Sequence, residues 1–191
     1  CSLCQDTGYV GDKKCICFKK AEIELLYTQS NLKEILKKEN FEHFSFDYYS
    51  DTMRNEATGL TERETAKKAF DTARNFVRTF DSCFENLFLY GDTGVGKTFL
   101  SHCIAQELLD TAHCVMYFSA FDLFDLLADS KFSREKNEGA EFILDSDLLI
   151  IDGATSDFTK DEVKLLSSYL KKGGKVVTLL AQTNKSMKNL Y

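Results

Sequence analysis

A glycine-rich stretch near the middle of the chain has the residue types and spacing that phosphate binding requires. Residues 91–98 read GDTGVGKT, which fits G-x-x-x-x-G-K-[ST], and they lie between a predicted strand and a predicted helix. Glycines allow successive N–H groups to converge on a phosphate, and the helix N-terminus adds partial positive charge. Lys97 would reach the β- and γ-phosphates, and Thr98 would offer its hydroxyl to Mg²⁺. We assign nucleotide-phosphate binding to the residues Gly91, Asp92, Thr93, Gly94, Val95, Gly96, Lys97, Thr98 and Phe99. This loop alone does not separate kinases, GTPases and ATPases.

An aspartate at the end of an apolar run is the second element of this site. Residues 148–152 read LLIID, the pattern of a fully buried strand, whose C-terminal end would place Asp152 beside the glycine-rich loop. From there a carboxylate holds Mg²⁺, usually through water. The alternative is an aspartate that caps the next helix. With Thr98, Asp152 therefore forms the predicted magnesium site.

A polar residue follows the last hydrophobic run. Residues 176–184 read VVTLLAQTN, a predicted strand that ends in Thr183 and Asn184. The Asn184 side chain there would contact the γ-phosphate or hold the attacking water, although asparagine is also a common turn former. Together with Lys97 and Asp152, Asn184 completes the catalytic residues that we predict.

Four of the seven cysteines lie within the first 17 residues, as a C-x2-C pair and a C-x-C pair. Four thiolates close a tetrahedral zinc site, and zinc binding is worth on the order of 10 kcal/mol in small modules, enough to order a segment without a core. Such a site has no open position, so the zinc would be structural. The alternative is four unconnected thiols. The predicted ligands are Cys1, Cys4, Cys15 and Cys17, whereas Cys83, Cys103 and Cys114 are expected to be small buried residues.

The elements that position these residues alternate between strands and helices. Apolar runs predict strands over 86–90, 114–118, 148–152 and 175–181, and periodic patterns predict helices over 97–111, 120–129 and 161–172. This alternation predicts an α/β fold with a parallel sheet covered on both faces. A further helix begins at Thr61, where Glu64 completes a capping box. Its predicted buried face consists of Ala66, Ala69, Phe70, Ala73, Phe76, Val77 and Phe80.

Changes in composition divide the chain into three parts. Residues 1–18 form the cysteine-rich module, residues 19–50 a helical connector with an aromatic segment, and residues 51–191 the nucleotide-binding core. In the connector, Leu and Ile at helical intervals predict two helices that meet near Ser30. Because the chain begins on Cys1 and ends soon after a predicted strand, we expect a fragment whose core is incomplete at its C-terminus.

The composition excludes several classes of protein. The net charge of −6 argues against bulk electrostatic coating of nucleic acid, although it permits local contact with DNA. No apolar run approaches the roughly 18 residues of a membrane span, and no signal peptide is evident, so we expect a cytoplasmic protein without a membrane partner.

The basic residues Lys131, Arg134 and Lys136 would contact phosphates or lie in a solvated loop. The aromatic residues of 41–49, FEHFSFDYY, would stack on adenine or DNA bases or pack in the core.

With these motifs in this order, the chain resembles the AAA+ ATPases of the bacterial replicative helicase-loader group, the DnaC/DnaI-type proteins, with transposition ATP-binding helpers as near neighbours. The likeness includes CQDTGY, CICFKK, NFEHFSFDYYSD and FENLFLYGDTGVGKTFLSHCIAQEL. It implies a replicative DNA helicase and single-stranded DNA as partners, with self-assembly through the AAA+ core. It also implies Lys97, Thr98 and Asp152 as nucleotide and magnesium residues and Asn184 as the first sensor. A neighbouring subunit would supply an arginine finger.

Gly153 departs from the pattern of that group. It occupies the position after Asp152 where a second acid usually orients the attacking water. A positioned acid or base contributes roughly 10² to 10⁴ in rate, so we expect Mg-ATP to bind and turnover to be slow. Two alternatives to a loader therefore stay open. One is a nucleotide-gated adaptor with little or no hydrolysis, and the other is a transposition helper, which generally lacks the N-terminal cysteines.

Overall fold

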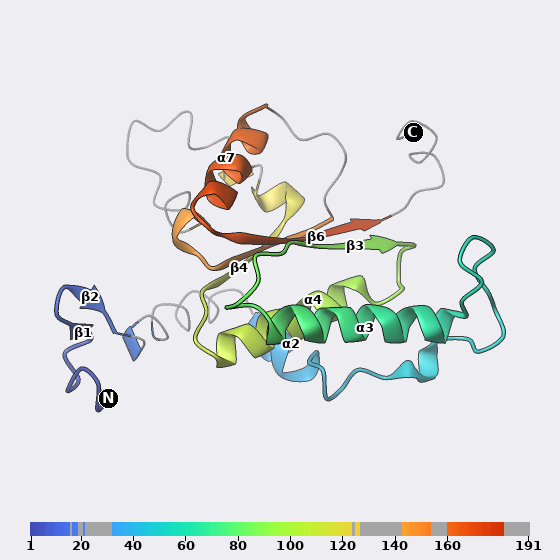
Figure 1. Ribbon diagram of the computed structural model, residues 1–191, viewed down its shortest axis with the longest axis horizontal. Coiled ribbons are helices and arrows are strands. Elements are labelled where there is room, and N and C mark those ends of the chain that lie inside the picture. The colour runs from blue at the N-terminus through green and yellow to red at the C-terminus, as the bar shows by residue number, and fades with distance from the viewer. Residues whose placement is uncertain are drawn as a thin grey trace.

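A parallel sheet runs through the protein, with helices on both of its faces (Figure 1). The computed structural model describes residues 1–15, 17–18, 21, 32–123, 125–126, 143–153 and 160–181. In this part of the chain the sheet has four strands in the order β3-β6-β5-β4, and each neighbouring pair is parallel. The strands are β3 (Leu87–Gly91), β4 (Val115–Ser119), β5 (Leu148–Asp152) and β6 (Lys175–Ala181).

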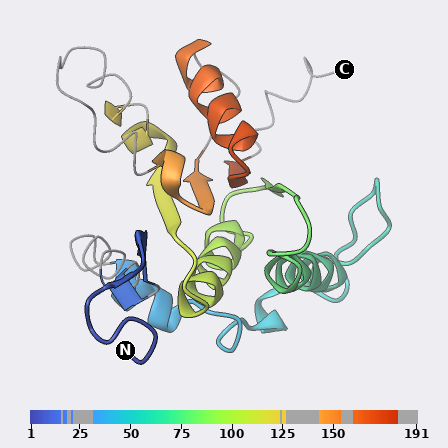
Figure 2. The ribbon, with the colours of Figure 1, turned by 60° about the vertical axis from the view of Figure 1, so that its left-hand side comes forward.

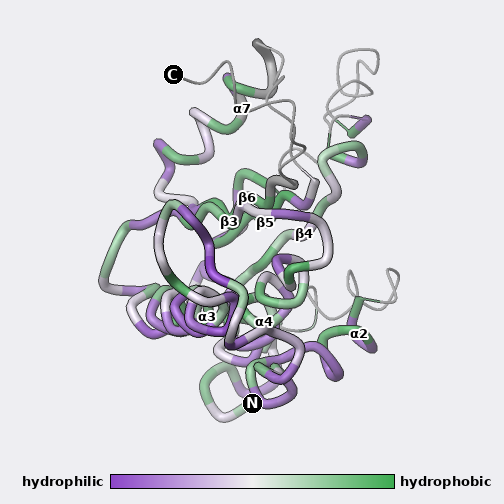
Figure 3. The backbone as a smooth tube through the Cα atoms, turned by 90° about the vertical axis from the view of Figure 1, so that its right-hand side faces the viewer, coloured by the Kyte–Doolittle hydropathy of each residue, from purple (hydrophilic) through white to green (hydrophobic). Residues whose placement is uncertain are grey.

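The sheet is buried most completely at β5. Successive side chains of a strand point to opposite faces, and here Leu148 and Ile150 enter one hydrophobic cluster while Leu149 and Ile151 enter the other. All four side chains are fully buried. Mainly hydrophobic residues line the strands (Figure 3). This double burial explains why residues 148–151 are apolar without alternation.

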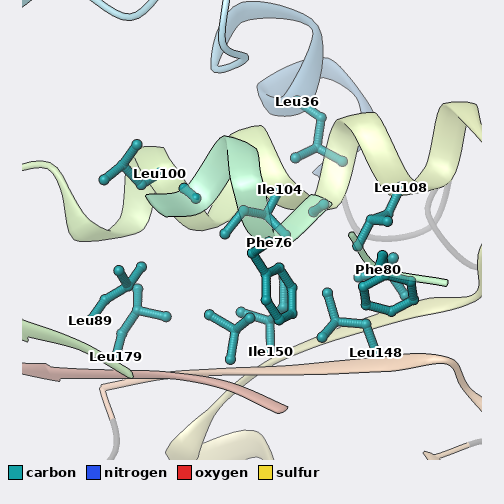
Figure 4. Packing of buried hydrophobic residues seen from close by; sticks show 14 residues of the cluster. Leu36, Phe76, Phe80, Leu89, Leu100, Ile104, Leu108, Leu148, Ile150 and Leu179 are labelled. Carbon is teal, nitrogen blue, oxygen red and sulfur yellow. The ribbon is translucent and has the colours of Figure 1, made fainter. Parts of the chain in front are cut away.

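Two long helices cover one face of the sheet, as the turned view in Figure 2 shows. Helix α3 (Glu62–Arg78) begins at the predicted capping box, in which Thr61 accepts from the Glu64 N–H and Glu64 accepts from the Thr61 N–H. Helix α4 (Lys97–Asp110) follows the glycine-rich loop. Figure 4 shows the packing of this layer, where Phe76 of α3 and Ile104 of α4 lie above the sheet.

A short helix extends this layer outward from α4. Helix α2 (Leu32–Lys38) buries Leu36 in the same cluster, with 1% of its surface exposed. After a short link, the 3-10 helix η1 (Phe46–Tyr48) leads toward α3. Helix α2 thus attaches the connector to α4, and the segment around η1 attaches it to α3.

Helix α7 (Lys160–Lys171) covers the opposite face of the sheet. Its Tyr169 is fully buried, and the hydroxyl donates to the Lys175 carbonyl at 3.2 Å. A Cβ atom at Gly174 would overlap the Tyr169 ring, so the close approach of the chain requires glycine here. Separately, β1 (Tyr9–Val10) and β2 (Lys13–Lys14) form an antiparallel pair within the cysteine-rich segment.

The predicted α/β fold, with a parallel sheet between helices, is confirmed. The strands lie within one residue of their predicted bounds, and α4 and α7 within one residue of theirs. The buried role predicted for three further cysteines is correct for Cys103 and wrong for Cys83, which is exposed beyond the end of α3; Cys114 is half-buried. The first predicted connector helix lies largely outside the described residues. None of the described helices is long and apolar enough to cross a bilayer.

Candidate nucleotide and metal sites

The glycine-rich loop joins β3 to α4 in the geometry that the sequence predicts. Gly94 and Gly96 have φ values of 86° and 89°, a region that residues with a Cβ rarely adopt. Gly96 is the N-cap of α4 and offers no side-chain hydrogen bond to the first turn. The first N–H groups of α4 are therefore available to an anion.

The Lys97 side chain folds back over the loop. Its Nζ donates to the carbonyl oxygens of Gly91 at 3.0 Å and Asp92 at 2.7 Å. These bonds hold the ammonium group above the turn, where a phosphate would be bound. When a phosphate binds, its charged oxygen would replace these neutral carbonyl oxygens as the acceptor of the Lys97 ammonium group. A hydrogen bond to a charged acceptor is the stronger one, so the exchange favours the phosphate.

Two residues that lie 54 positions apart in the chain meet beside the loop. The Thr98 hydroxyl, in the first turn of α4, donates to Asp152 Oδ2 at the end of β5 at 3.0 Å. A hydroxyl and a carboxylate are oxygen ligands of the kind that Mg²⁺ accepts together with phosphate oxygens and water. The donor chemistry at this position therefore fits the ion that the sequence predicts.

Gly153 follows Asp152 with a φ of +72°, and no atom lies within 4 Å of the position that a Cβ would take. Open space would accommodate a side chain here, but the backbone favours glycine. The described site thus contains one acid at the end of β5, and the second position holds a residue without a side chain.

Some predicted residues lie outside the described part of the chain. Asn184 follows β6, the strand between β3 and β5, and its own placement is not described. The same holds for the basic residues Lys131, Arg134 and Lys136. Their assigned roles stay predictions.

The aromatic segment mainly packs against the core. Phe44 lies within 5.5 Å, centroid to centroid, of Phe46, Phe70 and Phe99. Tyr48 is 90% exposed, so it is the ring of this segment with a free face. Phe99, which the sequence assigned to nucleotide binding, is one wall of this aromatic cluster.

Two tyrosines contact the site without having been predicted individually. The Tyr49 hydroxyl donates to the Val95 carbonyl of the loop at 3.1 Å, and burial raises the pKa of this tyrosine. The Tyr117 hydroxyl donates to Asp152 Oδ2 at 2.8 Å. Tyr49 belongs to an aromatic segment that drew attention in the sequence. The only sequence signal for Tyr117 is a hydroxyl in the apolar strand β4, two residues before its end.

The four N-terminal cysteines meet at one point. Their sulfur atoms all lie within 4.8 Å of one another, with Cys1 and Cys15 at 3.8 Å and Cys4 and Cys17 at 3.3 Å. Four sulfurs at the usual zinc–sulfur distance would lie about 3.8 Å apart. The predicted set of four thiol ligands is therefore brought together in a geometry that a metal ion fits.

Local hydrogen bonds favour the thiolate form of Cys4. The pKa of its thiol is lowered, first by a hydrogen bond with Cys17 and further by the backbone N–H groups of Gly8 and Asp6. The contact with Cys4 raises the pKa of Cys17 to about 11. The turn that aims these N–H groups places Gln5 and Asp6 at φ values of 50° and 63°, and Gly8 at 77°. One thiol of the pair is thus favoured as thiolate, the form that binds zinc.

The loop between β3 and α4 and the acid at the end of β5 define a P-loop protein of the α/β class. The model of the family described as IstB-like ATP binding protein matches residues 30–190, and the chain belongs to that family.

The curated proteins that match this chain include two replication initiators. The chain is 26% identical over 161 residues to the chromosomal replication initiator protein DnaA of Buchnera aphidicola subsp. Cinara cedri, covering 82% of this chain and 32% of that protein. A second DnaA, from Mycoplasma pneumoniae, is covered to 31% of its length. The chain thus spans about a third of the curated relatives it matches.

Solved structures show the same fold. The DnaI structure has a TM-score of 0.55 at 24% identity, covering 78% of this chain and 73% of that one. The structure of the DnaC helicase loader has a TM-score of 0.52 at 19% identity, covering 76% of this chain and 81% of that one. The structure of the replication initiator DnaA bound to AMPPCP and single-stranded DNA has a TM-score of 0.55 at 19% identity, covering 65% of this chain and 41% of that one. The predicted resemblance to the DnaC/DnaI-type proteins is thus confirmed at the level of the fold.

Proposed function

We propose that the protein binds ATP or ADP with Mg²⁺ and uses the bound nucleotide to help place a replicative DNA helicase on single-stranded DNA. The contact between Thr98 and Asp152, beside a glycine-rich loop at the start of α4, is the observation that carries the nucleotide part. It brings a hydroxyl and a carboxylate to the edge of the sheet where the loop lies.

Each residue of the site has a role in this proposal. The loop from Gly91 to Phe99 surrounds the phosphates, and Lys97 neutralises the β- and γ-phosphate oxygens. Thr98 and Asp152 hold Mg²⁺, which supplies positive charge to the phosphates when bound. Asn184 contacts the γ-phosphate or the attacking water. The core that begins near residue 51 forms the assembly unit.

The fold neighbours support the proposed partners. The DnaC helicase loader and a DnaA that binds single-stranded DNA both share the fold of this chain. A local contact with DNA is compatible with a net charge of −6, because it needs no bulk positive charge. We assign helicase contact to the N-terminal part of the chain and self-assembly to the core.

The cysteine cluster forms a structural zinc module over residues 1–18, linked to the core by the connector 19–50. The convergence of the four sulfurs supports this assignment. Since Cys1, Cys4, Cys15 and Cys17 use all four tetrahedral positions, zinc here stabilises the segment rather than taking part in hydrolysis.

A nucleotide-gated adaptor is the second candidate function, and Gly153 favours it. The position after Asp152 has no side chain and a left-handed backbone, so no acid projects from it. In this form the protein binds ATP and its partners but hydrolyses ATP poorly.

Nucleotide binding is tested by titrating a fluorescent ATP analogue in the presence of Mg²⁺ or of EDTA. We expect Asp152→Asn to remove most of the gain in affinity from Mg²⁺, and Lys97→Ala to weaken binding in both conditions. Asp71→Asn, which alters an exposed aspartate of α3, is the matched control. Wild-type protein that binds no nucleotide would exclude the proposal.

The helicase role is tested with the full-length protein and the replicative helicase of its host. We expect capture of the helicase that requires ATP and is lost in Lys97→Ala. Capture of a transposase instead of the helicase would favour the transposition helper, and capture of the helicase without hydrolysis would favour the adaptor.

A further inference from the structure

A tyrosine that lies outside the nucleotide motifs holds the magnesium carboxylate. Tyr117 is on β4, the strand next to β5, and its ring packs against the core cluster beneath α4. Its hydroxyl donates to Asp152 Oδ2 at 2.8 Å and lies 3.4 Å from Ser101 Oγ.

Asp152 Oδ2 thus accepts hydrogen bonds from two hydroxyl groups, one on an exposed residue and one on a half-buried ring. Thr98 is exposed, and its hydroxyl can rotate to present its oxygen to a cation, as the P-loop role requires. The Tyr117 hydroxyl sits at the end of a half-buried ring that packing holds in place. If a cation binds the Thr98 hydroxyl, the Tyr117 hydroxyl can therefore still donate its hydrogen bond to Asp152. This remaining hydrogen bond orients the Asp152 carboxylate.

The Tyr117 ring also packs beside a polar pair that joins α4 to the connector. The ring of His102 lies 5.1 Å from it, centroid to centroid, at an angle of 41°. His102 is buried, and its Nδ1 lies 2.6 Å from Glu39 Oε2. A buried imidazole needs a polar partner, so Glu39 sets the orientation of His102 and with it one wall of the Tyr117 site.

Glu39 belongs to the connector. It follows the last residue of α2, and its backbone N–H donates to Ile35 at 2.8 Å, which continues the helical turn. Leu36 anchors the same turn in the core. Contacts between side chains therefore run without a break from Asp152 through Tyr117 and His102 to Glu39.

We propose that Tyr117 is a positioning residue for Asp152 and that His102 and Glu39 connect it to α2, so that the connector and magnesium binding influence each other. This inference rests on the proposed binding of Mg-nucleotide at Asp152. Two packed elements, α2 and α4, would transmit the influence by a change in how the Tyr117 ring is held.

The positioning role is tested with Tyr117→Phe, which removes the hydroxyl and keeps the ring. A hydrogen bond to a charged group corresponds to roughly a tenfold effect or more. We expect the affinity gain from Mg²⁺ to fall about tenfold, with affinity in EDTA unchanged. Tyr169→Phe is the matched control, since it also removes a buried hydroxyl that donates a hydrogen bond, but on the other face of the sheet. An equal loss with and without Mg²⁺, or no loss, overturns the role of Tyr117.

The connection to α2 is tested with Glu39→Gln, which keeps the size of the side chain. Glu34→Gln, which alters an exposed glutamate of α2, is the control. We expect Glu39→Gln to lower the magnesium gain about threefold, and to add little once Tyr117→Phe is present, because both act through one carboxylate. Full additivity, no effect of Glu39→Gln, or an equal effect of Glu34→Gln overturns the connection. Wild-type protein without any magnesium gain would instead refute the proposed function.

Discussion

Replacing Gly153 with aspartate tests whether a missing acid limits ATP hydrolysis. The structure permits the change sterically, since no atom lies within 4 Å of the Cβ position. It also opposes the change conformationally, because a φ of +72° costs a residue with a Cβ roughly 1–2 kcal/mol. Aspartate and asparagine tolerate this region better than other residues. We therefore expect Gly153→Asp to lose a modest amount of stability.

The gain in rate has an upper bound and a matched control. A well-positioned acid or base contributes roughly 10² to 10⁴; the backbone at residue 153 was not shaped for this purpose, so we expect at least about tenfold from Gly153→Asp. Gly153→Asn has the same shape and the same backbone strain but no carboxylate. We expect it to show no gain.

The assay measures phosphate release by full-length protein at saturating Mg-ATP, with and without single-stranded DNA. Melting temperatures of the two variants should agree, because both carry the same strain. If wild-type protein hydrolyses ATP as fast as Gly153→Asp, another group supplies the missing acid and the adaptor hypothesis loses its basis. An equal gain in Gly153→Asn would show that the carboxylate is irrelevant.

Two further predictions concern the zinc module and α3. Protein purified under reducing conditions should contain about one zinc per chain; Cys17→Ser should lose it while Cys83→Ser, at an exposed cysteine outside the cluster, retains it. A wild-type protein without zinc by elemental analysis would exclude the module. Thr61→Ala removes the N-cap of α3 and should cost about 1 kcal/mol in unfolding free energy, whereas Thr72→Ala within the same helix should cost less. Equal losses in urea titrations would contradict the capping argument.

Much of the fold could be predicted because its central strand β5 is buried on both faces. Residues 148–151 are continuously apolar, and a short apolar run bounded by polar residues is typical of a central strand in a parallel sheet. The meeting of Thr98 and Asp152 also follows from the pattern, because the carboxyl ends of parallel strands lie at one edge of a sheet. The cysteine cluster was predictable from spacing alone.

The roles of Tyr117, His102 and Glu39 were not predictable in the same way. In the sequence, His102 has no evident nucleophile or metal partner, so nothing there indicates a role at the site. Its partner Glu39 is 63 positions away, and the ring between His102 and Asp152 comes from a third element. Periodicity reports which face a residue lies on, but not which side chain from a distant element meets it there. The prediction for Cys83 was wrong for a related reason: cysteine is usually buried, but here the chain has already left α3.

Two side chains that would bind the nucleotide and its ion, Lys97 and Thr98, already have partners within the protein, and this determines how binding can be selective. Lys97 must leave two carbonyl oxygens, and Thr98 must leave Asp152. Exchange of one hydrogen bond for another contributes little net free energy, so affinity must come from the charge of the phosphates and the cation. The Tyr117 hydroxyl is different, since it can remain on Asp152 throughout. The carboxylate is therefore oriented before the ion arrives, and a change at α2 that disturbs Tyr117 should act on the metal before it acts on the phosphates.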